Sequence, residues 1–541
     1  MTRIHLTIQP MSKYLIIFLL LVPFSAFSQE IYLNSASTDI EDFLSELAID
    51  HIIPALNSVA KPYSRQFIAK QLLEASLHDS LLTTRQKQEL QMYMNNYRLE
   101  IPVTKQLAGS GFSYDPVAFE KQGKVFRMSF RPMIGFRELV NGHGSESCLS
   151  AGAGVYSYLG KHIGISAEIY REFDSQILSD RSYFTSDPGG HWRKYSNGGG
   201  DYTEWTGQIS YSWKWGMAGI FKERFRWGDS YFGPDILSDK APAFPTIRIH
   251  AKPVRWIEFW YFHGWLVNDF TDNPKPDYDY SQKNLLNAHK FMAANILTVT
   301  PWKYLSISAG NSILYDGNIQ LAYLIPVMFY KSIDHTLNMP IENQNSQMFF
   351  SISSRQIRHL DLYLGMFFDE FMVSRIWNSE NNFISWKGGL RISNLLIRDL
   401  SLTVEGTRTL PMVYQHFLPN LTYESDGYCL GNWLKDNSQE FIVAAHYRPV
   451  KGMKVYVQFD FAQHGDNFIY TKMEEATNYP LLKNITWEKK ELDAGVNYWI
   501  TSNVNGSLSY SYRISTGEER FTPPALRGTT NSLWLGLNVG F

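Results

Sequence analysis

Six side chains that can bind a polar ligand fall within sixteen residues of the segment 221–248. They are Arg224, Arg226, Trp227, Tyr231, Asp235 and Asp239. Arginine makes charge-assisted hydrogen bonds to carboxylates, and aromatic rings offer flat faces for stacking. A second interpretation needs no ligand, because these arginines and aspartates could pair with one another and hold the segment in place inside the protein. Arg248, at the end of the segment, is a seventh candidate.

The segment must be a loop carried between two strands. Residues up to Trp227 can complete an alternating strand, and the alternation resumes at Thr246. Between them, Gly228-Asp229 and Gly233-Pro234 are turn dipeptides, and two further prolines lack the donor that a central strand needs. Long ordered loops in compact domains are usually functional, and the aromatic content of this one argues against disorder.

A second candidate segment is 172–202, which contains Trp192 and Arg193 among glycines and further aromatic residues. It could face the outside and bind a ligand, or it could be a mobile surface loop. Both interpretations remain open.

Catalytic and metal-binding motifs are not found. The later histidines are scattered among the predicted strands: His263, His289, His335, His359, His416, His446 and His464. The sequence contains no G-x-S-x-G, no H-E-x-x-H and no C-x-x-C. His416 is the best candidate for a catalytic histidine, but a histidine facing a polar interior is more common. We therefore expect no catalytic residue, no metal and no cofactor.

The N-terminus has the pattern of an export signal. An apolar run at 15–24 follows Lys13 and precedes small residues, which predicts a signal peptide over residues 1–28. No later apolar run reaches 18 residues, so membrane-spanning helices are excluded. The net charge of -2 gives no basic excess for nucleic acid. Only Cys148 and Cys429 are present, and either a disulfide or two free thiols is possible.

Residues 36–100 differ from the rest of the chain because their apolar residues recur at helical spacing. Ser64 is a predicted N-cap, and Thr83 with Gln86 forms a capping-box pattern. We expect three short helices that dock against the sheet formed by the rest of the chain, either as a simple cap or as a periplasmic plug or partner site.

Residues 105–541 alternate with a period of two. About sixteen such runs occur, joined alternately by short turns such as 159–162 and by long polar stretches. No 40–50-residue repeat indicates a propeller, and no linkers indicate a row of sandwiches. Aromatic residues near the strand ends suit two membrane interfaces. The predicted fold is therefore an all-β, antiparallel outer-membrane barrel of about 16–18 strands.

The chain resembles the Wzi capsule-assembly family in its Bacteroidota-type form. Three local patterns carry the resemblance. The first is Arg226-Trp227-Gly228, followed later by a proline-threonine-isoleucine-arginine run. The second is Leu321–Tyr330, which is similar to a tyrosine-leucine-x-proline strand before the asparagine-rich loop Glu342-Asn343-Gln344-Asn345, and the third is the strand end Phe368-Asp369-Glu370-Phe371. One departure is that Asp229-Ser230-Tyr231-Phe232 stand before Gly233, where the family is richer in glycine. The C-terminal strand ending in Phe541 also resembles a barrel insertion signal.

This resemblance implies an integral barrel of the outer membrane that anchors capsular or other surface polysaccharide. We do not expect it to be an enzyme. Its expected partners are that polysaccharide, outer-membrane lipid and a periplasmic protein at the N-terminal helices. A pore for small solutes and an outer-membrane enzyme acting on lipid or glycan remain as alternatives.

Overall fold

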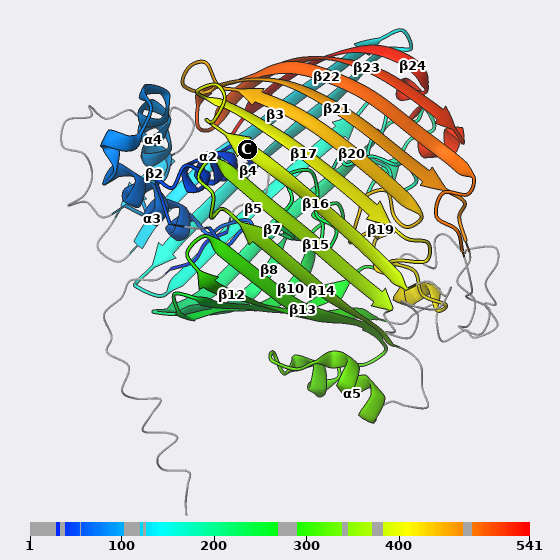
Figure 1. The fold of residues 1–541 in the computed structure, drawn as a ribbon, viewed down its shortest axis with the longest axis horizontal. Helices are drawn as coiled ribbons and strands as arrows, with labels where there is room; N and C mark the ends of the chain where they lie inside the picture. Colours follow the sequence, from blue (N-terminus) through cyan, green and yellow to red (C-terminus); the bar gives the residue numbers. More distant parts are fainter. Residues whose placement is uncertain are drawn as a thin grey trace, which may run out of the picture.

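The computed structural model describes residues 29–32, 38–54, 56–101, 119–122, 126–268, 289–337, 344–370, 382–468 and 479–540. Eighteen antiparallel strands close into one barrel (Figure 1). Their bounds are β3 (Phe126–Asn141), β4 (Gly144–Leu159), β5 (Ile163–Asp174), β7 (Gly200–Trp213), β8 (Gly216–Glu223), β10 (Phe244–Val254), β11 (Ile257–Leu266), β12 (Lys290–Trp302), β13 (Leu305–Asp316), β14 (Gln344–Ser354), β15 (Leu360–Glu370), β16 (Phe383–Ser393), β17 (Leu400–Thr409), β20 (Ser438–Tyr447), β21 (Met453–Gly465), β22 (Ile485–Thr501), β23 (Val504–Gly517) and β24 (Gly528–Val539). The predicted fold class is confirmed.

The barrel closes where β24 pairs with β3, over Leu533↔Val140 to Val539↔Ile134. Beyond that overlap, the short strand β2 (Phe119–Gln122) pairs with the first residues of β3. Closure leaves no free sheet edge, which is the condition for placing strands in lipid.

Side chains alternate across the wall, as the period of two predicts. On β7, Trp205 and Ile209 are exposed on the outer face, whereas Thr206, Gln208 and Ser210 are buried inside. The same alternation places large apolar residues outside and polar ones inside on β5 and β23. The outer face is therefore suited to lipid, and the lumen is polar.

The two rims of the barrel differ. Eight short turns form one rim: 160–162, 214–215, 255–256, 303–304, 355–359, 394–399, 448–452 and 502–503. The connections at the opposite rim are longer, apart from 142–143, and include 175–199, 224–243 and 410–437. We call these ends the short-turn rim and the long-loop rim. The long connections contain the two-residue strands β6 (Arg193–Lys194), β9 (Arg226–Trp227), β18 (Glu424–Ser425) and β19 (Tyr428–Cys429), and the 3-10 turns η5 (Pro419–Leu421), η7 (Glu519–Phe521) and η8 (Pro524–Leu526).

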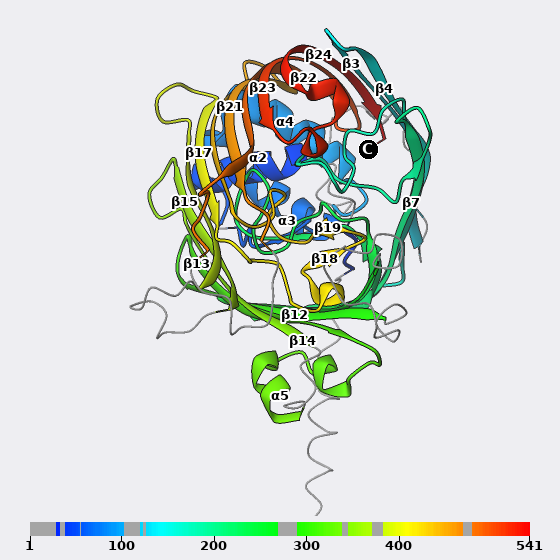
Figure 2. The same ribbon diagram turned by 90° about the vertical axis from the view of Figure 1, so that its right-hand side faces the viewer.

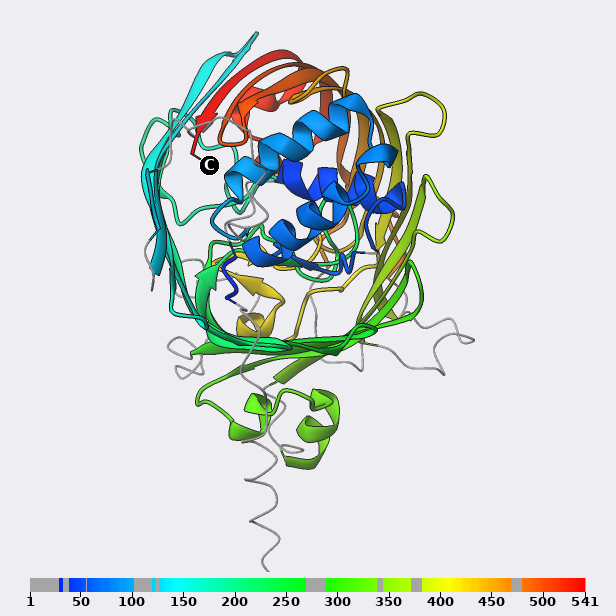
Figure 3. The same ribbon diagram turned by 90° about the vertical axis from the view of Figure 1, so that its left-hand side faces the viewer.

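Three helices close the short-turn rim: α2 (Thr38–Ile49), α3 (Arg65–Ser76) and α4 (Thr84–Asn96). Figure 1 shows them at one end of the barrel, and Figure 3, which looks onto that end, shows them across its opening. Ser64 caps α3, and Thr83 with Gln86 forms the predicted capping box of α4. The unit also contains β1 (Ala60–Lys61) and η1 (Asp79–Leu81). Among the described residues, no helix is long and apolar enough to cross a membrane.

Buried arginines tie these helices to the barrel. Arg85 of α4 donates to Asp399 at 2.7 Å in a short turn, to Glu89 at 2.5 Å, and to Glu46 of α2. From the barrel side, Arg448 donates to Asp39 at 2.7 Å. Burial would raise the pKa of Glu46, but Arg85 holds it at about 2. The helical unit is thus fixed by ion pairs that are kept from water.

A helical flap lies on the outside of the wall, and it corrects one expectation. Leu321–Tyr330 is not a strand: it contains the 3-10 turn η4 (Leu321–Leu324) and leads into α5 (Tyr330–Leu337), outside the barrel (Figures 1 and 3). Asn295 of β12 donates to the carbonyls of Pro326 and Met328 at 2.8 Å, and Asn311 of β13 accepts from the Tyr330 amide at 2.9 Å. The flap, residues 319–333, therefore covers polar groups on the outer face.

Other expectations have mixed outcomes. Cys148 and Cys429 are free thiols. The predicted signal peptide 1–28, the pair Glu342-Asn343, Phe371 and the terminal Phe541 lie outside the described residues.

Removing the Arg85 charge should loosen the helical unit. Arg85→Met leaves Glu46, Glu89 and Asp399 without this buried partner, and loss of one partner from a buried ion pair typically costs about 3–5 kcal/mol. The expected result is faster cleavage between the helices by added protease in detergent. Lys87→Met, on the same helix, is the control because its pair with Asp79 is exposed and contributes about 1 kcal/mol or less. Equal cleavage rates in the two variants would contradict the prediction.

Candidate functional site

The segment 224–243, between β8 and β10, enters the lumen from the long-loop rim and returns to it. We call it the plug segment. Its strand β9 pairs with β1 of the helical unit, joining Trp227 to Ala60 and Arg226 to Lys61. Trp227 also exchanges backbone hydrogen bonds with Leu237, so the two arms of the segment lie side by side. The plug segment therefore reaches through the barrel to the helices at the other end.

The tip of the plug segment is bound to the wall and to the helical unit. Asp229 accepts from Ser58 of that unit and from Ser351 of β14, both at 2.5 Å. The Tyr231 amide donates to Glu405 of β17 at 2.9 Å, and its hydroxyl donates to Asp361 at 2.8 Å. These partners are polar side chains of the barrel interior, so the tip has a fixed position.

Glycine is required at the turn that starts the tip. Gly228 has a φ of 136°, and a Cβ there would lie 2.7 Å from the Cβ of Pro234. Gly233 has a φ of 73°. Both values favour glycine, so Asp229–Phe232 form the tip between two glycines at positive φ.

Arg224 holds the other end of the plug segment. It donates to Glu204 of β7 at 2.7 Å, to the Gly189 carbonyl at 2.6 Å, and to three carbonyls of the returning arm at 3.1–3.2 Å. Except for Asp239, which is half-buried, these residues are buried. Arg224 therefore joins two long loops and the wall, and its hydrogen bonds go to the protein.

The loop 410–437 packs against the plug segment. Tyr414 and Tyr423 donate to the carbonyls of Asp235 and Ile236 at 2.7 and 2.9 Å. Figure 2 shows β18 and β19 of this loop inside the ring. A shared apolar cluster contains Phe225, Trp227, Ile236, Leu237, Met412, Val413, Tyr423, Tyr428 and Leu430. The two loops form one packed body in the lumen.

A cavity of about 630 Å³ remains beside this body. Its lining runs from Asn96 and Asn503 near the short-turn rim to Asp187 and Trp433 near the long-loop rim. Its lining combines arginines, acids and aromatic residues, including Arg131, Arg137, Arg224, Arg226, Glu172, Asp460, Tyr170, Tyr202 and Trp499. Arg137 and Asp187, whose side chains are 39% and 45% exposed, line the end of the cavity near the long-loop rim, which we call its mouth. Hydroxyl-rich ligands suit such a lining, because its charged side chains include both donors and acceptors.

The predicted site residues divide into three groups. Trp227 (3% exposed), Asp235 and Arg248 are buried, and Arg248 pairs with Glu223 at 2.5 Å. Arg224, Arg226, Tyr231 and Asp239 line the cavity while bonding to protein groups. Arg193, 67% exposed on β6, pairs with Asp201, and Trp192 packs against Tyr202.

Much of the cavity lining comes from residues that were not among the sequence candidates. Arg131 and Arg137 stand on β3, and Tyr170 and Glu172 on β5. Each lies at an inward position of its strand. In the sequence, each is a polar or charged residue that alternates with an apolar one along a strand. Many other inward residues of a polar lumen show the same pattern, so it does not single these four out.

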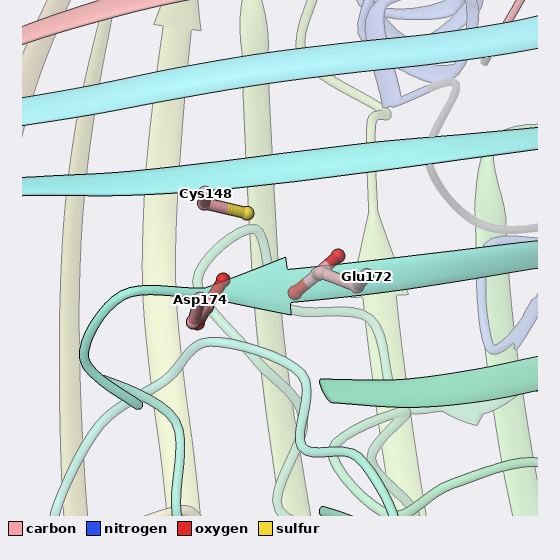
Figure 4. A group of neighbouring side chains, drawn as sticks. All are labelled: Cys148, Glu172 and Asp174. Atoms are coloured by element: carbon pink, nitrogen blue, oxygen red, sulfur yellow. The ribbon is translucent and has the colours of Figure 1, made fainter. Parts of the chain in front are cut away.

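Three potential metal ligands meet beside the cavity: Cys148 of β4, and Glu172 and Asp174 of β5. Their ligand atoms lie within 4.8 Å of one another (Figure 4). Arg137 is directly opposite Cys148 in the neighbouring strand. A guanidinium at that position balances the acids and opposes a bound cation, so the group is explained without a metal ion.

His416, the best catalytic candidate, lies in the loop 410–437 and not beside a nucleophile motif. Its Nδ1 accepts from the Leu418 amide at 3.1 Å. Burial lowers its pKa to about 4, which favours the neutral ring.

Asp235 gives the plug segment a dependence on pH. Burial raises its pKa to about 7, although Lys387 opposes the shift. An acid whose pKa is higher in the folded state adds stability at low pH, and this contribution is lost as the pH rises from about 4 to 7. We therefore predict that Asp235→Asn raises the unfolding temperature relative to wild type at pH 8 and changes it little at pH 4. The temperature at which the barrel loses its compact mobility on SDS gels measures the difference. An equal difference at both values would contradict the prediction.

Comparison with known proteins gives a likeness of fold. No protein-family profile matches the sequence, and no curated protein matches it. Among solved structures, Wzi of Escherichia coli, an outer-membrane protein involved in group 1 capsule assembly and described as a carbohydrate-binding β-barrel, superposes with a TM-score of 0.58. The match covers 95% of this chain and 99% of Wzi at 12% identity.

Two further similar structures are OccAB2 of Acinetobacter baumannii and OprD of Pseudomonas aeruginosa. OccAB2 has a TM-score of 0.44, 8% identity, and coverage of 77% of this chain and 99% of its own. OprD has a TM-score of 0.42, 7% identity, and coverage of 76% and 94%. At these identities the comparisons show the fold alone. The resemblance suggested by the sequence is confirmed at that level: the chain has the barrel fold of Wzi and of outer-membrane proteins.

Proposed function

We propose that this protein binds surface polysaccharide at the long-loop rim of an outer-membrane barrel and so holds it at the cell surface. The observation that carries the proposal is the cavity, which extends to the partly exposed Arg137 and Asp187 near the long-loop rim and is lined by arginines, acids and aromatic rings. Wzi, whose fold the chain shares, is itself described as carbohydrate-binding.

The lining has the chemistry that a sugar chain needs. Sugar rings stack on aromatic faces, and their hydroxyl groups need planar polar partners. Tyr170 and Tyr202 line the cavity as buried rings, while the partly exposed Arg137 offers a charge for acidic sugars. Short turns of outer-membrane barrels face the periplasm and longer loops face outward. In that orientation the mouth of the cavity faces the outside, and the helical unit faces the periplasm.

The plug segment has a supporting role in this proposal. Trp227 is enclosed by apolar residues, and Arg224, although it lines the cavity, donates to Glu204 and to backbone carbonyls, so we do not expect either side chain to bind the sugar. Their rigidity fixes one wall of the cavity. Sugar contacts then fall to the half-exposed residues at the mouth, with Arg193 and Trp192 near it on the rim.

Binding should weaken when the charge at the mouth is removed. Arg137→Gln keeps a hydrogen-bonding side chain but loses the charge, and a hydrogen bond to a charged group contributes about 1.5–3 kcal/mol. We expect about tenfold weaker binding of acidic polysaccharide isolated from the source cells, measured by calorimetry on the purified barrel.

Arg171→Gln is the matched control, because Arg171 is an exposed arginine at an outward position of β5. The proposal fails if wild type binds no polysaccharide, or if both variants lose affinity equally. Cells lacking the gene should also shed polysaccharide into the medium, and wild-type retention in those cells would contradict the anchoring role.

A passage for small solutes is a second candidate, because the cavity lining extends towards both rims. If the cavity is continuous, the protein in a planar bilayer gives current steps, and Ser150→Trp reduces them by filling the cavity. Leu149→Trp is the control, since Leu149 is exposed on the outer face of the same strand. Absence of steps from wild type would rule out this function.

A further inference from the structure

Seven of the eight turns of the short-turn rim carry positive charge. Each of these seven carries a lysine or arginine besides Arg355 and Arg448: Lys161, Lys214, Arg255, Lys303, Arg358, Arg398 and Lys451. Six are exposed, and Lys451 is half-buried. The turn 502–503 is the exception. We call these seven residues the basic rim.

Acidic residues are almost missing from the same turns. The structure describes all eight, and Asp399 is the single acid in them. Its carboxylate is already taken by Arg85 of the helical unit, with donors at 2.7 and 2.9 Å. Two more arginines of these turns, Arg355 and Arg448, point inward to the helices. The charged residues of these turns therefore fall into two groups. Arg355, Asp399 and Arg448 contact the helical unit, and the basic rim faces outward.

The opposite rim shows that this is not a general property of the connections. There, exposed cations are paired with acids in the same loops: Arg520 with Glu518 at 2.6 Å, Arg527 with Glu519 at 3.0 Å, and Lys194 with Asp180 at 2.6 Å. The long-loop rim thus has mixed charge, and the short-turn rim has charge of one sign.

Each cation of the basic rim stands beside an exposed apolar residue. Trp215 follows Lys214, Trp256 follows Arg255, and Trp302 precedes Lys303. The other turns present Leu159, Ile357, Leu396, Ile397 and Val450. Tryptophan favours the boundary between acyl chains and headgroups, and a neighbouring basic side chain can extend to the phosphate level. This pairing follows the perimeter of the barrel, continuous with its apolar outer face.

We propose that the basic rim binds the headgroups of anionic phospholipids in the leaflet that surrounds the short turns. The cations attract lipid phosphate, and the apolar residues beside them hold the turns at headgroup depth. A soluble periplasmic polyanion would need cations gathered on one side, whereas these are spread around the wall. The proposal concerns the opposite rim from the sugar site and does not depend on it.

Native mass spectrometry of the full-length protein tests this proposal, with phosphatidylglycerol and phosphatidylethanolamine of identical acyl chains as probes. The rim variant is Lys214→Gln, Arg255→Gln, Lys303→Gln and Arg398→Gln together. We expect wild type to retain phosphatidylglycerol preferentially, and the rim variant to lose that preference by about tenfold.

The matched control removes four exposed cations near the other rim: Arg171→Gln, Lys194→Gln, Arg520→Gln and Arg527→Gln. It should keep the preference, as should Lys214→Arg with Lys303→Arg, which preserves the charge. The proposal is overturned if the rim variant keeps the preference, if the control loses it equally, or if wild type binds soluble muropeptides but does not prefer phosphatidylglycerol. Compact gel mobility before heating shows that each variant is folded.

Discussion

Buried pairs between arginines and carboxylates hold the parts of this protein together. An eighteen-strand barrel encloses more space than its inward side chains can fill, and the chain fills it with pieces that are separate in sequence. Arg85 and Arg448 attach the helices, and Arg224 attaches the plug segment to β7 and to the loop before it. In each case the guanidinium serves several acceptors at once, which lets one buried charge fix more than two segments.

The barrel could be predicted from the sequence because its cause is local. Alternation of apolar and polar residues along single strands, as in residues 205–215, indicates a sheet with one apolar and one polar face. Closure of the barrel follows because a free sheet edge cannot lie in lipid. The capping box at Thr83 and Gln86 is equally local. The sequence also predicts that the helices dock against the sheet, although their place across the short-turn rim depends on the ion pairs of Arg448 and Arg85 with residues far away in sequence.

The candidate site was harder to predict for a physical reason. A loop that contains arginine, tryptophan and aspartate has the same composition whether these side chains bind a ligand or bind one another. Trp227 and Arg224 turn out to be enclosed by Phe262, Leu237 and backbone carbonyls, which only the folded arrangement of three loops reveals. Arg137 belongs to a strand, and the sequence does not distinguish it from other charged residues at inward positions. The Leu321–Tyr330 run failed as a strand because its proline and apolar residues serve a turn packed on the outside.

The flap has a consequence for how the barrel is built. Asn295 and Asn311 lie on the outer face, where acyl chains offer them no hydrogen bonds, and the flap supplies partners through Pro326, Met328 and Tyr330. Strands β12 and β13 are therefore fit for lipid only after the connection from β13 to β14 has folded back over both. Because that connection also presents Leu321 and Val327 outward, 79% and 76% exposed, the closed flap restores an apolar exterior. Asn311 also donates to Asn295 at 2.8 Å, so the two outward amides and the flap form one hydrogen-bonded group that acyl chains could not replace.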